Sequence, residues 1–163
     1  MFEAGALAAT SPEDFYAELA RQLTGLLAGE QDFIANAANM AALIFNTVPD
    51  LNWAGFYFLQ GDVLVLGPFQ GKPACVRIPL GRGVCGAAAA GRQTLRIEDV
   101  NAFPDHIACD SASRSELVVP LLRDGEVLGV LDLDSPHPGR FTAADQAGME
   151  RLAALFVSAS DTL

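Results

Sequence analysis

SELVVPLLRDGEVLGVLDLDS, residues 115–135, contains two apolar runs of strand length on either side of Asp124-Gly125. Asp-Gly between apolar runs is typical of a tight turn, so this segment predicts a β-hairpin. Three acids, Glu116, Asp132 and Asp134, stand near the strand ends far from the turn, among apolar neighbours. Acids in such surroundings need a structural or chemical reason, because burying a charge is costly.

The register of this hairpin decides whether the three acids meet. Asp132 and Asp134 share a face because side chains alternate along a strand. A two-residue turn would place Glu116 opposite Leu133, on the other face. A three-residue loop, Arg123-Asp124-Gly125, would place Glu116 directly opposite Asp132. The hypothesis of a shared carboxylate cluster therefore requires the three-residue loop.

Carboxylates that face one another across strands repel unless a cation lies between them or one is protonated. The cluster therefore predicts a site for an ammonium or a metal ion, or a neutral acid able to donate a proton. The alternative is that these acids are ordinary solvated strand ends. An amine is favoured over a metal, because His106 and His137 lie outside the DLD segment and show no ligand spacing with it.

Outward from this hairpin, the chain alternates strand and helix patterns. LNWAGFYFL and VLVLGPF predict a first hairpin around residues 60–62, and CVRIPL and TLRIEDV predict two further strands. Ser11-Pro12 predicts the start of an N-terminal helix that runs to about Gly29. Further helices are expected over about 30–47, ending before Pro49, over the Ala-rich segment 83–91, and from Thr142, where Asp145 completes a capping-box pattern.

These elements predict an α+β fold. We expect an antiparallel β-sheet with N-terminal and C-terminal helices packed on one face and loops and short helices over the other. The length of 163 residues fits one domain over residues 1–163, with residues 1–10 as a loosely ordered N-terminus.

Composition limits the classes of partner. The net charge of −10 argues against nucleic acid and against an anionic membrane surface, which both select for clustered Lys and Arg. The N-terminus lacks the basic region of a signal peptide, and no apolar run is long enough to span a bilayer. We therefore expect a cytoplasmic protein, in which a disulfide is more often catalytic than structural.

All three cysteines, Cys75, Cys85 and Cys109, lie within one turn-rich stretch of the chain. Gly, Pro, Lys, Arg and His surround them, and partial exposure beside cationic groups lowers the pKa of a thiol. The alternative is that each is a small buried hydrophobe. His106, three residues before Cys109, is a candidate for stabilising its thiolate. Trp53 and Tyr57 share a face and are candidates for lining a pocket, although such aromatics are most simply core residues.

Three segments carry a resemblance to a known family: NWAGFYFL, KPACVRIPLGRGVCG with HIACDSASRSELVVPL, and GVLDLDSP followed by GRFT. Together they resemble the free methionine-(R)-sulfoxide reductases, which are single-domain members of the GAF fold. The resemblance extends from about Ser11 to the C-terminus. GAF domains as a class mostly bind ligands without transforming them, so the three-cysteine pattern, and not the fold, implies catalysis.

The resemblance implies an oxidoreductase that acts on a sulfur group with a disulfide as acceptor, serving in oxidative stress repair. It implies Cys109 as the nucleophile and Cys75 as the usual resolving thiol, with Cys85 able to pair in some members. The residues implied for substrate binding are Glu116, Asp132, Asp134, Trp53 and Tyr57. Thioredoxin is the expected reductant, a homodimer is expected, and the reaction requires no metal and no bound organic cofactor.

Two other functions are alternatives to the predicted oxidoreductase. One is a non-catalytic GAF module that senses a small molecule, although the sequence shows no attached output domain. The other is a thiol redox switch without a substrate, which leaves the carboxylate cluster without a role.

Overall fold

The computed structural model describes residues 7 and 9–161 of the chain. The expectation of a loosely ordered N-terminus over residues 1–10 falls largely outside them. The elements follow in the order α1 (Pro12–Leu27), α2 (Phe33–Thr47), β1 (Trp53–Gln60), β2 (Val63–Gly71), β3 (Arg77–Pro79), α3 (Gly83–Gly91), β4 (Leu95–Ile97), the 3₁₀ turn η1 (Val100–Ala102), β5 (Ser115–Arg123), β6 (Glu126–Ser135) and α4 (Ala143–Ala159).

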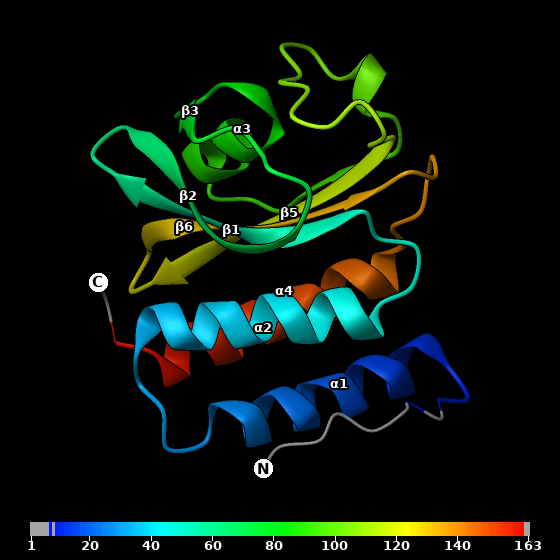
Figure 1. The fold of residues 1–163 in the computed structure, drawn as a ribbon, viewed down its shortest axis with the longest axis vertical. Coiled ribbons are helices and arrows are strands. Elements are labelled where there is room, and N and C mark those ends of the chain that lie inside the picture. Colours follow the sequence, from blue (N-terminus) through cyan, green and yellow to red (C-terminus); the bar gives the residue numbers. More distant parts are fainter. Residues whose placement is uncertain (1–6, 8, 162–163) are drawn as a thin grey trace.

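The centre of the molecule is one antiparallel sheet of six strands in the order β3-β2-β1-β6-β5-β4. Helices α2 and α4 cover one face of the sheet, and α1 forms an outer layer against them (Figure 1). The short helix α3 and the long connection between β4 and β5 cover the opposite face (Figure 1). This arrangement confirms the predicted α+β fold.

Local capping signals place the helix ends. The Ser11 side chain accepts a hydrogen bond from the Asp14 backbone N–H, and Pro12 occupies the first turn of α1, as predicted. Thr142 and Asp145 form the predicted capping box at the start of α4. Helix α2 begins at Phe33 and not at residue 30, because the Asp32 carboxylate caps it by accepting from the Ala35 N–H.

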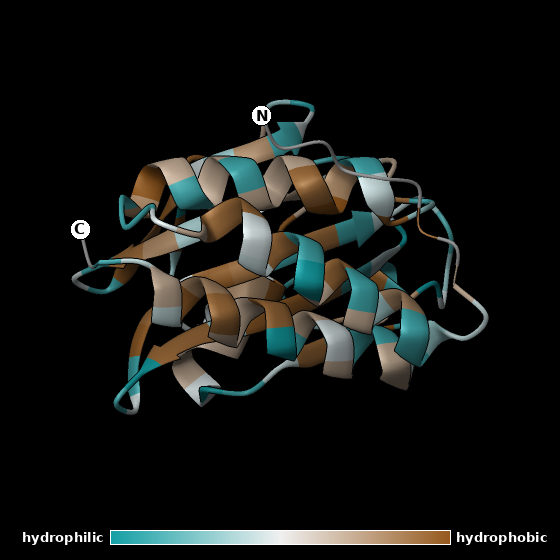
Figure 2. Ribbon diagram, turned by 90° about the horizontal axis from the view of Figure 1, so that it is seen from below, coloured by the Kyte–Doolittle hydropathy of each residue, from teal (hydrophilic) through white to brown (hydrophobic). Residues whose placement is uncertain are grey.

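The main hydrophobic core lies between the sheet and the helices. The rings of Phe56, Phe58 and Phe156 pack together, with a Phe56–Phe156 centroid distance of 4.9 Å. Figure 2 looks onto the helical side, and the strands behind the helices are mostly hydrophobic. Because this core is built from one face of each central strand, the alternate residues project to the other face, under α3.

The hairpin of β5 and β6 corrects one sequence-based prediction. Arg123 pairs with Glu126, so Asp124-Gly125 is a two-residue turn, and both of its residues have positive φ, at 52° and 80°. Such a turn matches the twist of the flanking strands. The predicted three-residue loop is therefore wrong, and so is the predicted direct pairing of Glu116 with Asp132.

The acids nevertheless share one face, because a β-bulge changes the register further along the hairpin. Leu121 pairs with Gly129 while Leu122 pairs with Val127, so β6 has one extra residue, Leu128. Beyond the bulge, Glu116 lies opposite Asp134, and Asp132 lies opposite Val118. A Cβ atom on Gly129 would lie 2.1 Å from the carbonyl oxygen of Tyr57, so the close approach of β1 requires glycine at this bulge.

Among the described residues, no helix combines the length and the apolar character needed to cross a bilayer.

Candidate active site

A small cavity of about 40 Å³ lies on the face of the sheet under α3. It is enclosed by three parts of the chain: the sheet itself, the start of α3, and the two loops that carry Cys75 and Cys109. Every residue predicted for substrate binding lines it. The lining comprises Trp53, Tyr57, Lys72, Pro73, Ala74, Ile78, Gly83, Val84, Cys85, His106, Ile107, Cys109, Asp110, Ser113, Glu116, Asp132 and Asp134.

Cys75 and Cys109 are joined by a disulfide bond, with their Cα atoms 5.5 Å apart. They are 34 residues apart in the chain, on the connection from β2 to β3 and on the connection from β4 to β5. Cys109 lines the cavity. Cys75 is bonded to Cys109 but is not itself one of the residues that line the cavity. The disulfide therefore reaches the cavity through Cys109, with Cys75 directly behind it as the exchange partner.

Trp53 and Tyr57 hold the Cys75 loop as well as lining the cavity. The Trp53 indole N–H donates to the carbonyl oxygen of Lys72 at 3.1 Å, and the Tyr57 hydroxyl donates to the carbonyl oxygen of Cys75 at 2.9 Å. The two rings stack with centroids 5.9 Å apart. Both are almost fully buried, so one strand, β1, sets the position of this loop over the cavity.

The Cys109 loop is held by Asn52, which sequence reasoning had not singled out. Its side-chain amide donates to Asp110 Oδ2 at 3.2 Å and to Ser113 Oγ at 3.0 Å. The Ala112 backbone N–H donates to Asp110 and is the main cause that lowers the pKa of that carboxyl. The only sequence signal for Asn52 was its position directly before β1, which by itself is not specific.

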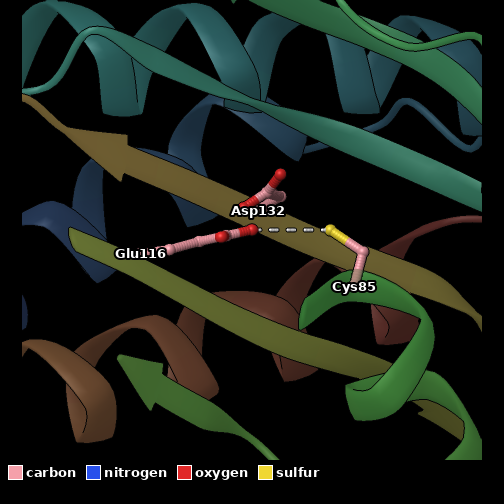
Figure 3. Close-up of side chains that lie close together, drawn as sticks. All are labelled: Cys85, Glu116 and Asp132. Atoms are coloured by element: carbon pink, nitrogen blue, oxygen red, sulfur yellow. Dashed lines mark hydrogen bonds between the residues drawn. The ribbon is translucent and has the colours of Figure 1, made fainter. Parts of the chain in front are cut away.

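The predicted carboxylate cluster is present, with Cys85 within it (Figure 3). Glu116 and Asp132 are 6% and 5% exposed, and Asp134 is partly exposed beside them. The Cys85 thiol donates to Glu116 Oε1 with a sulfur–oxygen distance of 3.8 Å. Within the described part of the chain, Asp132 Oδ1 is buried without a hydrogen-bond partner. A polar atom in that condition favours a bound ligand or water.

Burial dominates the electrostatics of the cluster. It raises the pKa of Glu116 well above its ordinary value, and the charges of Asp132 and Asp134 raise it further. Burial also raises the pKa of Asp132 to about 6, and burial together with Asp132 raises that of Asp134. Close like charges cannot all ionise cheaply, so burial and mutual repulsion favour protonated acids in the cluster, and a protonated acid can donate its proton.

Cys85 differs from the sequence-based interpretation. The glycines and arginine near it in the sequence suggested a partly exposed thiol beside a cation, but the side chain is buried against carboxyl groups. Burial first, and then the neighbouring acids, raise the pKa of its thiol. It is therefore a neutral thiol in this state and not an activated one.

His106 also belongs to the cavity wall. Its Nε2 atom lies 4.0 Å from Glu116 Oε2, and burial lowers its pKa. The expectation that His106 stabilises a Cys109 thiolate stays a prediction. His137, by contrast, lies 3.9 Å from Asp50 on an exposed part of the surface.

Donor atoms of Cys85, Glu116 and Asp132 lie within 4.8 Å of one another, so these three residues are close enough together to hold a metal ion. The arrangement as a whole supports thiol chemistry: a pair of cysteines able to cycle, a group of acids able to hold protons or a cation, and aromatic walls. That combination suits reduction of a small substrate that carries an ammonium group, with a disulfide formed in the protein.

Comparison with known proteins agrees with this chemistry. The GAF domain model matches residues 11–159. The chain is 57% identical over 141 residues to the free methionine-R-sulfoxide reductase of Escherichia coli, covering 86% of each chain. It is 42% identical over 151 residues to the protein of that name from Saccharomyces cerevisiae, covering 88% of this chain and 84% of the yeast protein.

A solved structure gives the same result. The free methionine-R-sulfoxide reductase of Neisseria meningitidis in complex with its substrate matches with a TM-score of 0.93 at 44% identity, covering 98% of this chain and 95% of that one. The chain therefore belongs to the GAF domain family, in the group of the free methionine-R-sulfoxide reductases.

Proposed function

We propose that this protein is an oxidoreductase that reduces free methionine-(R)-sulfoxide to methionine within a single catalytic domain. The observation that carries the proposal is the disulfide between Cys75 and Cys109 at the wall of a cavity whose floor holds buried acids. A module that only senses a metabolite has no need of this disulfide, and a plain redox switch has no need of the acids.

The thiols carry the electrons. In the reduced protein the Cys109 thiolate attacks the sulfoxide sulfur, oxygen passes to Cys109, and methionine leaves, so that Cys109 becomes a sulfenic acid. Cys75 then attacks the sulfenic sulfur, water leaves, and the disulfide forms. The sulfoxide gains two electrons and the thiol pair loses two. Of the two cysteines that form the disulfide, Cys109 lines the cavity and Cys75 does not, which supports Cys109 as the nucleophile.

The acids supply the proton and the binding charge. The sulfoxide oxygen must be protonated before it leaves sulfur, and we assign Glu116 as the donor because burial and the neighbouring acids raise its pKa and so favour its protonated form. We assign the substrate ammonium to Asp132 and Asp134, because both line the cavity. We assign the packing of the substrate side chain to Trp53 and Tyr57, which supply aromatic surface to the same cavity.

Recycling requires an external dithiol, and we propose thioredoxin for this step. It would open the Cys75–Cys109 disulfide by thiol–disulfide exchange and restore both thiols. A reducing compartment such as the cytoplasm suits this cycle, because the resting enzyme must hold free thiols. The homodimer implied by the resemblance also stays a proposal, which sedimentation of the full chain tests directly.

The test is a coupled assay with free methionine-(R)-sulfoxide, thioredoxin, thioredoxin reductase and NADPH. NADPH oxidation should depend on the sulfoxide and should stop in Cys109→Ser, a matched replacement of sulfur by oxygen. A sensor would bind the ligand without oxidising NADPH. A redox switch would be reduced once, without continuing turnover. Preference for the S epimer would contradict the proposed stereochemistry.

A further inference from the structure

Cys85, Glu116 and Asp132 form a compact set of potential metal ligands (Figure 3). Their donor atoms lie within 4.8 Å of one another, and each residue is at most 6% exposed. They come from α3, β5 and β6, so their backbone positions are set by the rigid part of the fold. Ligands held in this way need little rearrangement to converge on one ion.

A second observation points to a ligand at this position. Asp132 is buried, yet its Oδ1 atom has no hydrogen-bond partner within the described residues. This residue lines the cavity, which at about 40 Å³ has room for an ion or a few waters. An unpaired, buried carboxylate oxygen is costly, and a cation would remove that cost.

The donor chemistry narrows the choice of cation. A thiolate is a soft ligand and the two carboxylates are hard ligands. Zn²⁺ accepts both kinds, whereas Mg²⁺ and Ca²⁺ prefer oxygen ligands. A bound metal ion would displace the protons of the Cys85 thiol and of the acids, and a divalent ion balances the resulting negative charge better than an ammonium does. His106, with Nε2 4.0 Å from Glu116 Oε2, lies beside this set and offers an imidazole nitrogen for a fourth position.

We propose that Cys85, Glu116 and Asp132 bind a thiophilic divalent cation, Zn²⁺, in the space that the substrate ammonium is expected to occupy. Zinc bound there would exclude the sulfoxide and act as a competitive inhibitor. The binding itself does not depend on catalysis, whereas the competition rests on the proposed function. The two can therefore fail separately.

The oxidised protein allows a clean test of binding. The chain has three cysteines, all of them described, and two form the disulfide, so Cys85 is the single free thiol. Co²⁺ serves as the spectroscopic probe, with Zn²⁺ added to displace it. We expect a thiolate-to-cobalt charge-transfer absorption in the near ultraviolet that zinc abolishes. Absence of binding, or binding without this absorption, would overturn the proposal.

Variants locate the ligands. Cys85→Ser should abolish the charge-transfer absorption, and Asp132→Asn should weaken cobalt binding by more than about tenfold, since even outer partners of a metal change affinity by 10- to 100-fold. Removal of the disulfide thiols in Cys75→Ser/Cys109→Ser should leave the absorption in place. His137→Ala, which alters the exposed His137 and Asp50 pair, is the matched surface control and should not change the affinity. Circular dichroism checks that each variant is folded.

Competition is measured on the same oxidised protein. Free methionine-(R)-sulfoxide should lower the charge-transfer absorption more than alanine does at equal concentration, because alanine chelates cobalt in solution through the same amine and carboxylate. Equal effects of the two amino acids would refute a shared site for zinc and substrate. Displacement by the sulfoxide alone would support it.

Discussion

Replacement of Cys75 tests the division of labour among the three thiols most directly. In Cys75→Ser, the Cys109 sulfenic acid would lose its partner, and Cys85 would be the remaining thiol of the chain. Burial and the adjacent acids raise the pKa of Cys85 well above the ordinary value of 9.0. At pH 7 a thiol with such a pKa is less than about 1% thiolate, and only the thiolate attacks.

The expected result is a burst followed by a slow phase. Reduced Cys75→Ser, freed of external thiol, should release one methionine per chain and then accumulate a sulfenic acid that dimedone traps. A disulfide between Cys85 and Cys109 should form at least about 100-fold more slowly than resolution by an ionised thiol, and its rate should rise about tenfold per pH unit from pH 7 to 9. Chromatography counts methionine, and mass spectrometry follows the adduct.

Two variants serve as controls for this experiment. Cys85→Ser should retain the wild-type disulfide and show the mildest loss of turnover, whereas Cys109→Ser should release no methionine even once. If resolution in Cys75→Ser were as fast as in the wild-type protein and independent of pH, the prediction would be wrong, because Cys85 would then be an activated thiol.

Three further predictions concern the acids and the bulge. N-acetylmethionine sulfoxide should lose about a hundredfold or more in kcat/KM relative to the free amino acid, because it lacks the ammonium and leaves buried acids unpaired; comparable values would exclude a free-amino-acid site. The pKa of Asp132 rises on folding from 3.8 to about 6, so its stabilising contribution is complete below pH 3.8 and lost as pH rises through 6. Asp132→Asn should therefore raise the free energy of unfolding by up to about 3 kcal/mol at pH 8 and should not raise it at pH 4. Urea denaturation measures both values, and a loss of stability at pH 8 would contradict this prediction. Gly129→Ala should lower the free energy of unfolding by about 3 kcal/mol or more and should lower kcat/KM. Gly125→Ala, whose added methyl group has no atom within 4 Å, should lower the free energy of unfolding by about 1 kcal/mol. Equal urea midpoints for the two variants would contradict the role given to the bulge.

Much of the fold could be predicted because its signals are local. The caps at Ser11 and Thr142 act within a few residues, so the sequence around them contains the complete signal for a helix start. The alternation of apolar residues likewise placed the strands and the face that carries Asp132 and Asp134. The family motifs identified all three acids and the two aromatics that line the cavity.

The environment of Cys85 could not be read in this way. Its sequence neighbours are glycines and an arginine, but its spatial neighbours are acids on two distant strands. Electrostatic interactions depend on distance in space and not along the chain. The pKa of the Cys85 thiol is therefore raised, whereas its sequence neighbours predicted a lowered pKa. The role of Asn52 was hidden for a similar reason, since its partners Asp110 and Ser113 lie about 60 residues away in the chain.

The order of residues is enough to place three acids near the ends of two adjacent strands, with a tight turn between those strands. Whether the three acids meet depends on the complete fold. The two-residue turn alone would have put Glu116 on the opposite face, and the extra residue Leu128 restores it. A bulge depends on how β6 packs against both of its neighbours, with Gly129 pressed against the backbone of β1, and no local pattern contains that information.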